Sequence, residues 1–252
     1  MAATTQYHNL KDKVVFITGG ASGIGAAMVR AFCQQGAKVA FIDIDKQAAE
    51  QLLAELPQST TWFRQVDVTD SQALQQSLQD AVATLGALHV LVNNVANDER
   101  QASEEVSVKD WDQCLKVNLN PAFFASQTAV SLMKAQGGGS IINFSSINAL
   151  MGQPNMAGYV TAKAGLIGMT RALARDYGEY SIRVNAIIPG WVATDRQLSS
   201  WFTEQEQQKW IAAMALKKLV SPADVANLAL FLASDNSAMI TGQGIKIDGG
   251  RL

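Results

Sequence analysis

Histidine and cysteine are scarce in this 252-residue sequence, which has two of each. His8 lies in an N-terminal leader and His89 begins an apolar segment, so neither a histidine-based metal site nor a Ser-His-Asp triad is expected. Cys33 and Cys114 fall in segments predicted to be helical and show no metal-ligand spacing. We expect inert thiols at these positions, no disulfide framework and no bound metal.

The sequence also has no large excess of charge of one sign and no long hydrophobic run. The chain has 20 basic and 22 acidic side chains, a net charge of -2, and no run of Lys or Arg. Neither an electrostatic binding surface for nucleic acid nor a polybasic membrane anchor is therefore expected. Because no stretch of ~18 apolar residues and no signal-peptide pattern occurs, we expect a cytoplasmic protein that acts on a small molecule.

Short apolar, β-branched segments alternate with segments of helical period along the chain. Such alternation predicts a parallel sheet with helices on both faces, an α/β fold. The 252 residues with 48% hydrophobic side chains suit one doubly wound (Rossmann) domain over residues 1–252 with a seven-stranded sheet. The predicted strands are Val14–Thr18, Val39–Ile42, Thr61–Val66, Val90–Val92, Ile141–Phe144, Val184–Ile188 and Ile245–Ile247.

A segment rich in Trp, Gln and Glu follows the sixth predicted strand. It spans about residues 190–219 and contains Trp191, Trp201, Phe202 and Trp210. A long excursion after a strand is typical of a lid over a substrate site. Two surface helices that pack their aromatic side chains inward are the alternative.

The first predicted strand leads into a glycine-rich turn, Thr18-Gly19-Gly20-Ala21-Ser22-Gly23-Ile24-Gly25, and a helix is predicted from about Ala26. Glycines at such a turn let the backbone approach a pyrophosphate, and the helix N-terminus offers free N–H groups. The spacing is GxxxGxG instead of GxGxxG. We expect a dinucleotide to bind here, with a plain tight turn as the alternative. The candidate residues are Gly19, Ser22, Gly23, Ile24 and Gly25.

Acidic and amide side chains end the next three predicted strands. Asp43 lies where a carboxylate binds the adenosine ribose and repels a 2'-phosphate, which favours NAD over NADP. Asp45 is the fallback for this role, and either aspartate could instead cap a helix. Asp67 and Val68 are expected near the adenine, although Asp67 could equally cap the next helix. The pair Asn94 and Ala96 is expected to pass close to the cofactor.

Tyr159 and Lys163 are four residues apart in a predicted helix and therefore share one face. An ammonium about 4 Å from a phenol contributes roughly 4 kcal/mol at an effective dielectric of ~20. This interaction predicts a phenol pKa lowered by up to about three units, so that Tyr159 exchanges a proton with a substrate near pH 7.

Together these motifs resemble the short-chain dehydrogenase/reductase family, and the resemblance spans nearly the whole chain. It implies a catalytic set of Asn118, Ser146, Tyr159 and Lys163. In that set Tyr159 accepts the proton, Ser146 binds the reacting oxygen, Lys163 binds the nicotinamide ribose and Asn118 holds a relay water. It also implies contacts from Pro189, Val192 and Thr194 to the nicotinamide.

The sequence departs from the family pattern at one place. The family usually has Asn-Asn-Ala-Gly where this chain has Asn93-Asn94-Val95-Ala96. Replacing the glycine by Ala96 requires a backbone conformation that ordinary residues adopt. The resemblance further implies a homotetramer, in which long helices pair across two-fold axes.

Polar side chains follow the fourth predicted strand and surround the expected reaction site. Buried polar groups need hydrogen-bonding partners, so such a rim suits a compact polyol, whereas a solvated loop is the alternative. The candidate substrate-binding residues are Asn97, Asp98, Ser146, Asn148, Tyr159, Trp191 and Arg196, and Gln153, Asn155 and Gln197 could add to the rim.

These segments are similar to those of bacterial sugar dehydrogenases within the family, namely D-xylose, L-arabinose, galactose and fucose 1-dehydrogenases. This resemblance implies oxidation of an aldose at C1 to the aldonolactone with NAD. Two alternatives stay open: a dehydrogenase or reductase of another polyol, sugar acid or 3-oxoacyl compound, and a non-catalytic NAD-binding sensor.

Overall fold

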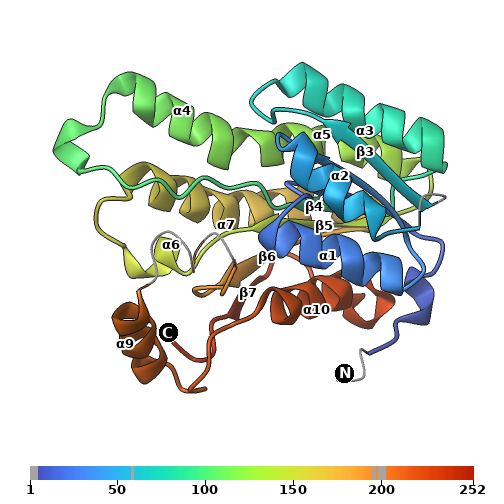
Figure 1. Ribbon diagram of the computed structural model, residues 1–252. Coiled ribbons are helices and arrows are strands. Elements are labelled where there is room, and N and C mark those ends of the chain that lie inside the picture. Colours follow the sequence, from blue (N-terminus) through green and yellow to red (C-terminus); the bar gives the residue numbers. More distant parts are fainter. Residues whose placement is uncertain (1–4, 58–59, 195–196, 198–202) are drawn as a thin grey trace.

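The computed structural model describes residues 5–57, 60–194, 197 and 203–252. Its centre is one parallel sheet in the strand order β3-β2-β1-β4-β5-β6-β7 (Figure 1). The strands are β1 (Val14–Thr18), β2 (Lys38–Asp43), β3 (Thr61–Gln65), β4 (Val90–Asn93), β5 (Gly139–Phe144), β6 (Ile182–Pro189) and β7 (Gly244–Ile247). The predicted seven-stranded doubly wound sheet is confirmed, and strand order reverses between β1 and β4.

Helices cover both faces of this sheet. Helices α1, α2 and α10 pack on one face, and α3, α5 and α7 pack on the other (Figure 1). Their bounds are α1 (Gly23–Gln34), α2 (Lys46–Ala54), α3 (Ser71–Leu85), α4 (Val108–Asn118), α5 (Asn120–Lys134), α6 (Asn148–Met151), α7 (Ala157–Tyr177), α9 (Glu204–Ala213) and α10 (Pro222–Ala233).

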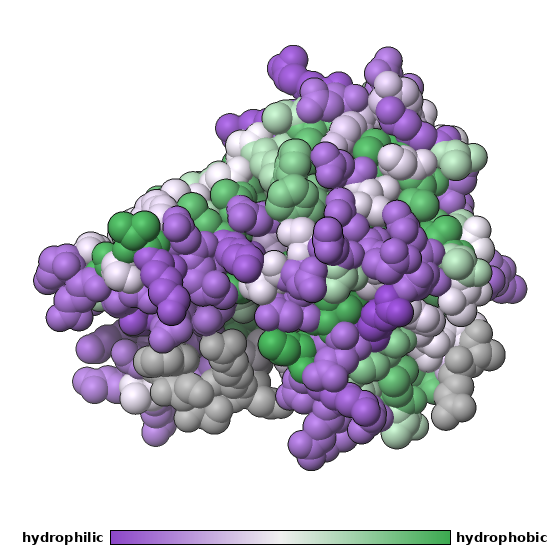
Figure 2. All heavy atoms as spheres, turned by 90° about the horizontal axis from the view of Figure 1, so that it is seen from above, coloured by the Kyte–Doolittle hydropathy of each residue, from purple (hydrophilic) through white to green (hydrophobic). Residues whose placement is uncertain are grey.

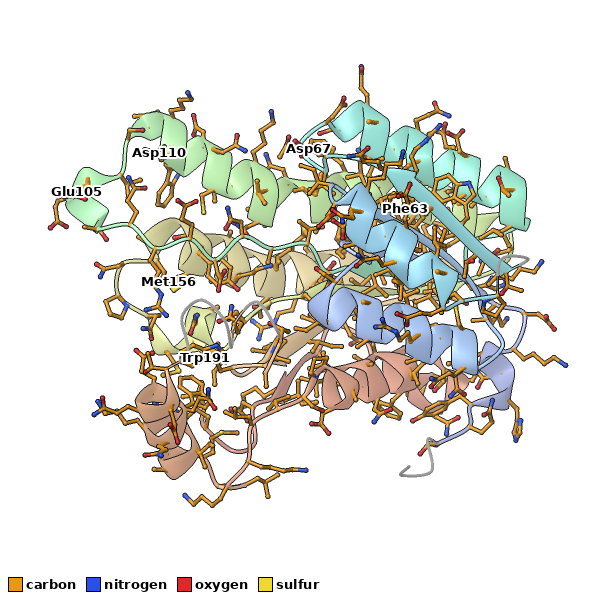
Figure 3. All side chains as sticks on the ribbon, viewed as in Figure 1. Phe63, Asp67, Glu105, Asp110, Met156 and Trp191 are labelled. Atoms are coloured by element: carbon orange, nitrogen blue, oxygen red, sulfur yellow. The ribbon has the colours of Figure 1, made fainter. Side chains whose placement is uncertain are left out.

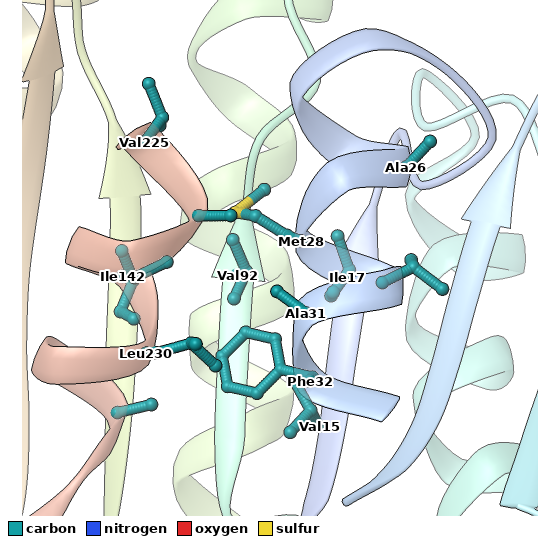
Figure 4. Close-up of a cluster of buried hydrophobic side chains, with 14 of the residues drawn as sticks. Val15, Ile17, Ala26, Met28, Ala31, Phe32, Val92, Ile142, Val225 and Leu230 are labelled. Carbon is teal, nitrogen blue, oxygen red and sulfur yellow. The ribbon is translucent and has the colours of Figure 1, made fainter. Parts of the chain in front are cut away.

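Two hydrophobic cores follow from the alternation of side chains along the strands. In β1, Val15 and Ile17 face α1 and α10, whereas Phe16 faces the helices of the opposite side. Figure 4 shows the first of these clusters, in which Phe32 of α1 and Leu230 of α10 pack over β1 and β4. Because every residue of β1 is buried, the strand reads as a continuous apolar run in the sequence.

Helix α1 begins earlier than the sequence predicts. It starts at Gly23, three residues before Ala26, because Ser22 stands in extended conformation at the N-cap. Gly23 has a φ of +52°, which glycine adopts without strain. The helix N-terminus therefore reaches further into the turn than expected.

A break separates α4 from α5 and sets the position of Asn118. Leu119 leaves helical geometry with φ −128° and ψ −56°, and Pro121 lies in the first turn of α5. Proline lacks the N–H that a continuous helix requires at that point, so a new helix starts there. Asn118 consequently ends α4, where its amide turns toward the loop that follows β4.

Within the described ranges, no helix combines the length and apolarity that crossing a bilayer requires. Figure 2 shows hydrophilic side chains interspersed with hydrophobic ones over the face seen from above in Figure 1. In a parallel sheet of this topology, a ligand binds at the loops that follow the carboxyl ends of the strands.

Candidate active site

A cavity of about 760 Å³ opens at the carboxyl ends of the strands. It is lined by predicted cofactor residues Gly19, Ser22, Gly23, Ile24, Gly25, Asp43, Asp67, Val68, Asn94, Ala96, Pro189, Val192 and Thr194. Predicted catalytic and substrate residues Asn97, Asp98, Ser146, Asn148, Tyr159, Lys163 and Trp191 line it as well. Of the other candidates, Asn118 does not line the cavity, and Arg196 lies outside the described residues, as do Trp201 and Phe202.

The glycine-rich turn is packed so tightly that Gly20 and Gly25 leave no room for a side chain. A Cβ on Gly25 would lie 1.8 Å from the carbonyl oxygen of Gly19, and one on Gly20 would lie 2.5 Å from Cβ of Phe41. Gly19 itself has a φ of +66°. The turn therefore brings bare backbone to the cavity wall, as the approach of a pyrophosphate requires.

The N-terminus of α1 faces the same part of the cavity. Ser22 at the N-cap makes no side-chain hydrogen bond to the helix, so the first-turn N–H groups receive no cap from it. Thr194 lies opposite, with its Cγ2 3.3 Å from where a Cβ of Gly23 would stand. Backbone donors and the positive end of the helix dipole thus meet in one place, which fits the phosphate groups of a dinucleotide.

Asp43 ends β2 beside the glycine-rich turn. Its Oδ2 accepts from the Ala21 N–H at 2.9 Å, and its Oδ1 accepts from the Asp45 N–H at 3.0 Å. A carboxylate has about four acceptor sites, so each oxygen keeps capacity for a ribose hydroxyl. Asp45 instead caps α2 by accepting from the Ala48 N–H at 3.0 Å. Asp43 is therefore the better placed of the two to bind a ribose hydroxyl.

The loop after β4 is tied to the glycine-rich turn by Asn94. Its Nδ2 donates to the carbonyls of Thr18 and Gly19 at 3.1 and 3.0 Å, so its side chain orders the turn. The non-glycine residues with positive φ in the described chain are Asp12, Asn155 and Ser181. Ala96 is not among them, so the loop accepts alanine where the family usually has glycine.

Asp67 lines the cavity beyond β3 and does not cap the following helix. Its Oδ1 accepts from the Thr69 N–H at 2.9 Å and closes a local turn. The cap of α3 is Asp70, which accepts from the N–H groups of Gln72 and Ala73. The helix-cap alternative for Asp67 is therefore wrong, since a second aspartate takes that place.

Tyr159 and Lys163 project from α7 beneath the cavity, with exposed fractions of 8% and 1%. The Nζ of Lys163 donates to the Phe144 carbonyl at the end of β5, 2.9 Å away, and lies 5.7 Å from the centre of the Tyr159 ring. Ser146 acts to lower the pKa of Tyr159 through its hydroxyl, which also accepts from the Asn148 N–H at 3.2 Å. Ser145 points away and donates to the Lys163 carbonyl at 2.7 Å.

Burial, and not the neighbouring ammonium, dominates the pKa of Tyr159. The pKa of Tyr159 is raised to about 12, chiefly by desolvation and to a smaller extent by the Asp98 carboxylate, while the hydrogen bond with Ser146 acts to lower it. Burial also lowers the pKa of Lys163 to about 8. The predicted depression of the phenol pKa is therefore wrong for this structure, because the loss of water at a buried phenol is the largest influence on its pKa.

Asn118 holds the loop that carries two of the substrate candidates. Its Oδ1 accepts from the Asn97 N–H at 2.9 Å, and its Nδ2 donates to the carbonyls of Asn97 and Cys114, each at 3.0 Å. These bonds join the loop after β4 to the end of α4. Asn118 thus acts on the site through Asn97, and the relay water stays a prediction.

The substrate end of the cavity includes residues that the sequence reasoning missed. Gln113 and Val117 reach the cavity from α4, and Met156 reaches it from the start of α7. The spacing of four between Gln113 and Val117 is the signal that could have placed them on one helix face. Figure 3 shows Met156 and Trp191 at the same end of the molecule, beside α6 and α9. Over the described ranges, no group of three His, Cys, Asp or Glu side chains is arranged to hold a metal ion.

Substitution of Lys163 by Met is expected to stabilise the protein at pH 7 because it removes a buried charge. The pKa of about 8 lies below the ordinary 10.5, so the ammonium costs the folded state roughly 3 kcal/mol at pH 7 before the lost Phe144 bond is counted. At pH values between these two pKa values, the unfolded chain binds more protons than the folded chain does. The free energy of unfolding of the wild type therefore rises with pH over this range. The excess of the free energy of unfolding of Lys163→Met over that of the wild type should therefore shrink between pH 8 and about 10. Urea unfolding measures this excess.

The matched control for this prediction is Lys109→Met, at an exposed position of α4. The difference in free energy of unfolding between Lys109→Met and the wild type should not change over the same pH range. A Lys163→Met difference that is equally constant with pH would contradict the buried-charge explanation.

The comparisons with known proteins agree with this geometry. Residues 19–251 match the family model described as enoyl-(acyl carrier protein) reductase. "Probable galactose dehydrogenase GalD" of Rhizobium meliloti (strain 1021) is 45% identical over 98% of both chains. The D-xylose 1-dehydrogenase of Caulobacter vibrioides is 42% identical over 97% of both chains.

A further relative and one solved structure match nearly the whole chain. A 3-oxoacyl-[acyl-carrier-protein] reductase of Thermotoga maritima is 37% identical over 96% of this chain and 98% of its own. The crystal structure of a protein described as a short-chain alcohol dehydrogenase from Sinorhizobium meliloti 1021 superposes with a TM-score of 0.92 at 32% identity, covering 97% of this chain and 98% of the other. The chain therefore belongs to the short-chain dehydrogenase/reductase family of oxidoreductases, whose dehydrogenases use a nicotinamide cofactor.

Proposed function

We propose that this protein oxidises an aldose at C1 to the aldonolactone with NAD. The observation that carries the proposal is the convergence of Tyr159, Ser146 and Lys163 under a cavity whose other wall is rich in amides and carboxylates. The similarity to proteins named as galactose and D-xylose dehydrogenases supports the same substrate class. The proposal includes one catalytic domain over residues 1–252 with a substrate lid at about residues 190–219, of which 195–196 and 198–202 lie outside the described residues.

The catalytic side chains have distinct tasks in this proposal. Ser146 hydrogen-bonds the anomeric hydroxyl oxygen, and Tyr159 takes the proton of that hydroxyl at its phenol oxygen. Lys163, held by the Phe144 carbonyl, keeps donors for the nicotinamide ribose and supplies positive charge beside the phenol. The nicotinamide supplies the site that accepts hydride from C1. Asn118 acts through the loop that it holds.

The cofactor wall suits NAD better than NADP. Asp43 would accept hydrogen bonds from the adenosine ribose hydroxyls, and its charge would repel a 2'-phosphate. Gly19, Ser22, Gly23, Ile24 and Gly25 would hold the pyrophosphate, Asp67 and Val68 the adenine side, and Asn94, Ala96, Pro189, Val192 and Thr194 the nicotinamide side. These assignments rest on the position of each residue along the cavity.

The substrate end offers partners for a compact polyol. Asn97, Asp98 and Asn148 supply amide and carboxylate groups, and Trp191 supplies an aromatic surface for the apolar face of a sugar ring. Each group loses a partner if the substrate lacks hydroxyls, which favours a sugar over an acyl chain. Other polyols, sugar acids and 3-oxoacyl compounds are the alternatives within the same chemistry, and a non-catalytic NAD sensor is the alternative outside it.

A homotetramer and a cytoplasmic location, both expected from the sequence, belong to this proposal as well. Helices α5 and α7 carry a second, smaller cavity of about 370 Å³ with apolar lining, including Phe123, Phe124 and Met169. Phe123 is 39% exposed. An apolar surface on two long helices is suited to pairing with another copy of the chain.

Tyr159→Phe should strongly reduce turnover while leaving NAD binding intact. The variant keeps the ring but cannot accept a proton, so kcat should fall by roughly 10²–10⁴-fold. Because the base form becomes more abundant as pH rises toward a pKa of about 12, wild-type oxidation should accelerate with pH, and the residual rate of the variant should not. Initial rates on a panel of aldoses, polyols and 3-oxoacyl thioesters measure both effects.

The matched control is Tyr177→Phe on the same helix, which should leave the rates unchanged. Absence of turnover for every aldose in the panel removes the sugar assignment. Equal activity of Tyr159→Phe and the wild type removes the base assignment, and NAD binding without turnover of any substrate favours the sensor.

Asp43→Ala should weaken NAD binding by about tenfold or more and relax discrimination against NADP. The substitution removes the acceptor for the ribose hydroxyls and the charge that repels a phosphate. Dissociation constants for both cofactors, measured by fluorescence titration, test this. Asp45→Ala is the control, and a larger loss of discrimination in that variant would move the role to Asp45.

Phe123→Asp should dissociate the proposed tetramer. A charge at the centre of an apolar contact loses its hydration without gaining a partner. Sedimentation velocity should show four copies of the 27.0 kDa chain for the wild type and a smaller species for the variant. A monomeric wild type at micromolar concentration contradicts the tetramer.

A further inference from the structure

A chain of two hydrogen bonds crosses the substrate end of the cavity. The indole Nε1 of Trp191 donates to Oε1 of Gln197 at 2.8 Å, and Nε2 of Gln197 donates to Oδ2 of Asp98 at 2.9 Å. Asp98 follows β4 and Trp191 follows β6, so Gln197 connects the two loops that flank the reaction site. We refer to Trp191, Gln197 and Asp98 together as the amide bridge.

The amide of Gln197 satisfies both partners of this bridge. An indole N–H is purely a donor, and an ionised carboxylate is purely an acceptor. The residue between them must therefore accept at one atom and donate at another, which the two ends of the Gln197 side chain do. A carboxylate at the same position would accept from Trp191 but would face Asp98 with a like charge.

Both ends of the bridge are anchored by other side chains. The Trp191 ring packs edge-on against Trp210 of α9 with centroids 5.3 Å apart, and Arg251 lies 5.0 Å from the centre of the Trp210 ring. On the other side, Asn118 binds both the N–H and the carbonyl of Asn97, the residue before Asp98. The bridge therefore joins two supported walls.

We propose that Gln197 is a positioning residue that sets substrate size: it holds Asp98 as an acceptor for a sugar hydroxyl and holds Trp191 across the cavity. A compact polyol fits beneath the bridge, whereas an extended acyl or polycyclic alcohol meets it. This inference rests on the proposed function for the identity of the substrate. The bridge itself is defined by the three side chains and their contacts.

The decisive variant is Gln197→Glu, which preserves size and the bond from Trp191 but repels Asp98. We expect the KM for the best aldose to rise by about tenfold or more, kcat to change by less than about threefold, and the dissociation constant for NAD to stay unchanged. The ratio of kcat/KM for a hydroxysteroid, a polycyclic alcohol, to that for the aldose should rise. Gln208→Glu, the same change at an exposed position of α9, is the matched control.

A second change should restore the bridge. In the double variant Asp98→Asn with Gln197→Glu, the amide donates and the carboxylate accepts, so the second hydrogen bond forms in the reverse direction. The amide oxygen introduced at position 98 still accepts from a sugar hydroxyl. We expect the KM of the double variant to return to within about threefold of the wild type, a recovery that additive damage would not produce.

The outcomes separate this inference from the function on which it rests. Absence of aldose turnover by the unaltered protein removes the proposed function. Aldose turnover with an unchanged KM in Gln197→Glu removes the bridge alone. A double variant that is worse than Gln197→Glu, or a single variant that loses NAD binding together with kcat, also overturns the positioning role.

Discussion

The candidate site depends on a pair of hydrogen bonds that lock α7 to the end of β5. Lys163 donates through Nζ to the Phe144 carbonyl, and Ser145 donates through Oγ to the Lys163 carbonyl. The two bonds run in opposite directions between the same two segments, so neither segment slides without breaking both. Tyr159, one helical turn earlier, and Ser146, the next residue after Ser145, are thereby brought together. Burying the ammonium for this purpose costs the folded state roughly 3 kcal/mol at neutral pH.

The rest of the site is assembled by amide side chains that connect loops. Asn94 joins the loop after β4 to the glycine-rich turn, Asn118 joins that loop to α4, and Gln197 joins it to the segment after β6. Asn94 donates through its side chain to two carbonyls, whereas Asn118 and Gln197 each donate and accept through their side chains. These three side chains therefore connect the loops that form the cofactor and substrate walls.

The fold was predictable because the relevant signals are local. The continuous burial of β1 and β4 appears directly as apolar runs, and the glycine-rich turn needs residues without side chains, as Gly25 against the Gly19 carbonyl shows. The pKa of Tyr159 was not predictable, because a spacing of four residues does not report burial. Ser145 and Ser146 are likewise adjacent and alike in sequence, yet one anchors Lys163 and the other faces Tyr159.

The sequence by itself determined the alternating strands and helices, the bare backbone of the cofactor turn and the shared helix face of Tyr159 and Lys163, since each follows from neighbours along the chain. Only the tertiary structure decided which carbonyl receives the Lys163 ammonium, which loop Asn118 holds and which side chains Gln197 connects. Asp98 and Gln197 are 99 positions apart, and the parallel strand order brings them within hydrogen-bonding distance. Contacts of that kind depend on how distant segments pack, a property that no local pattern records.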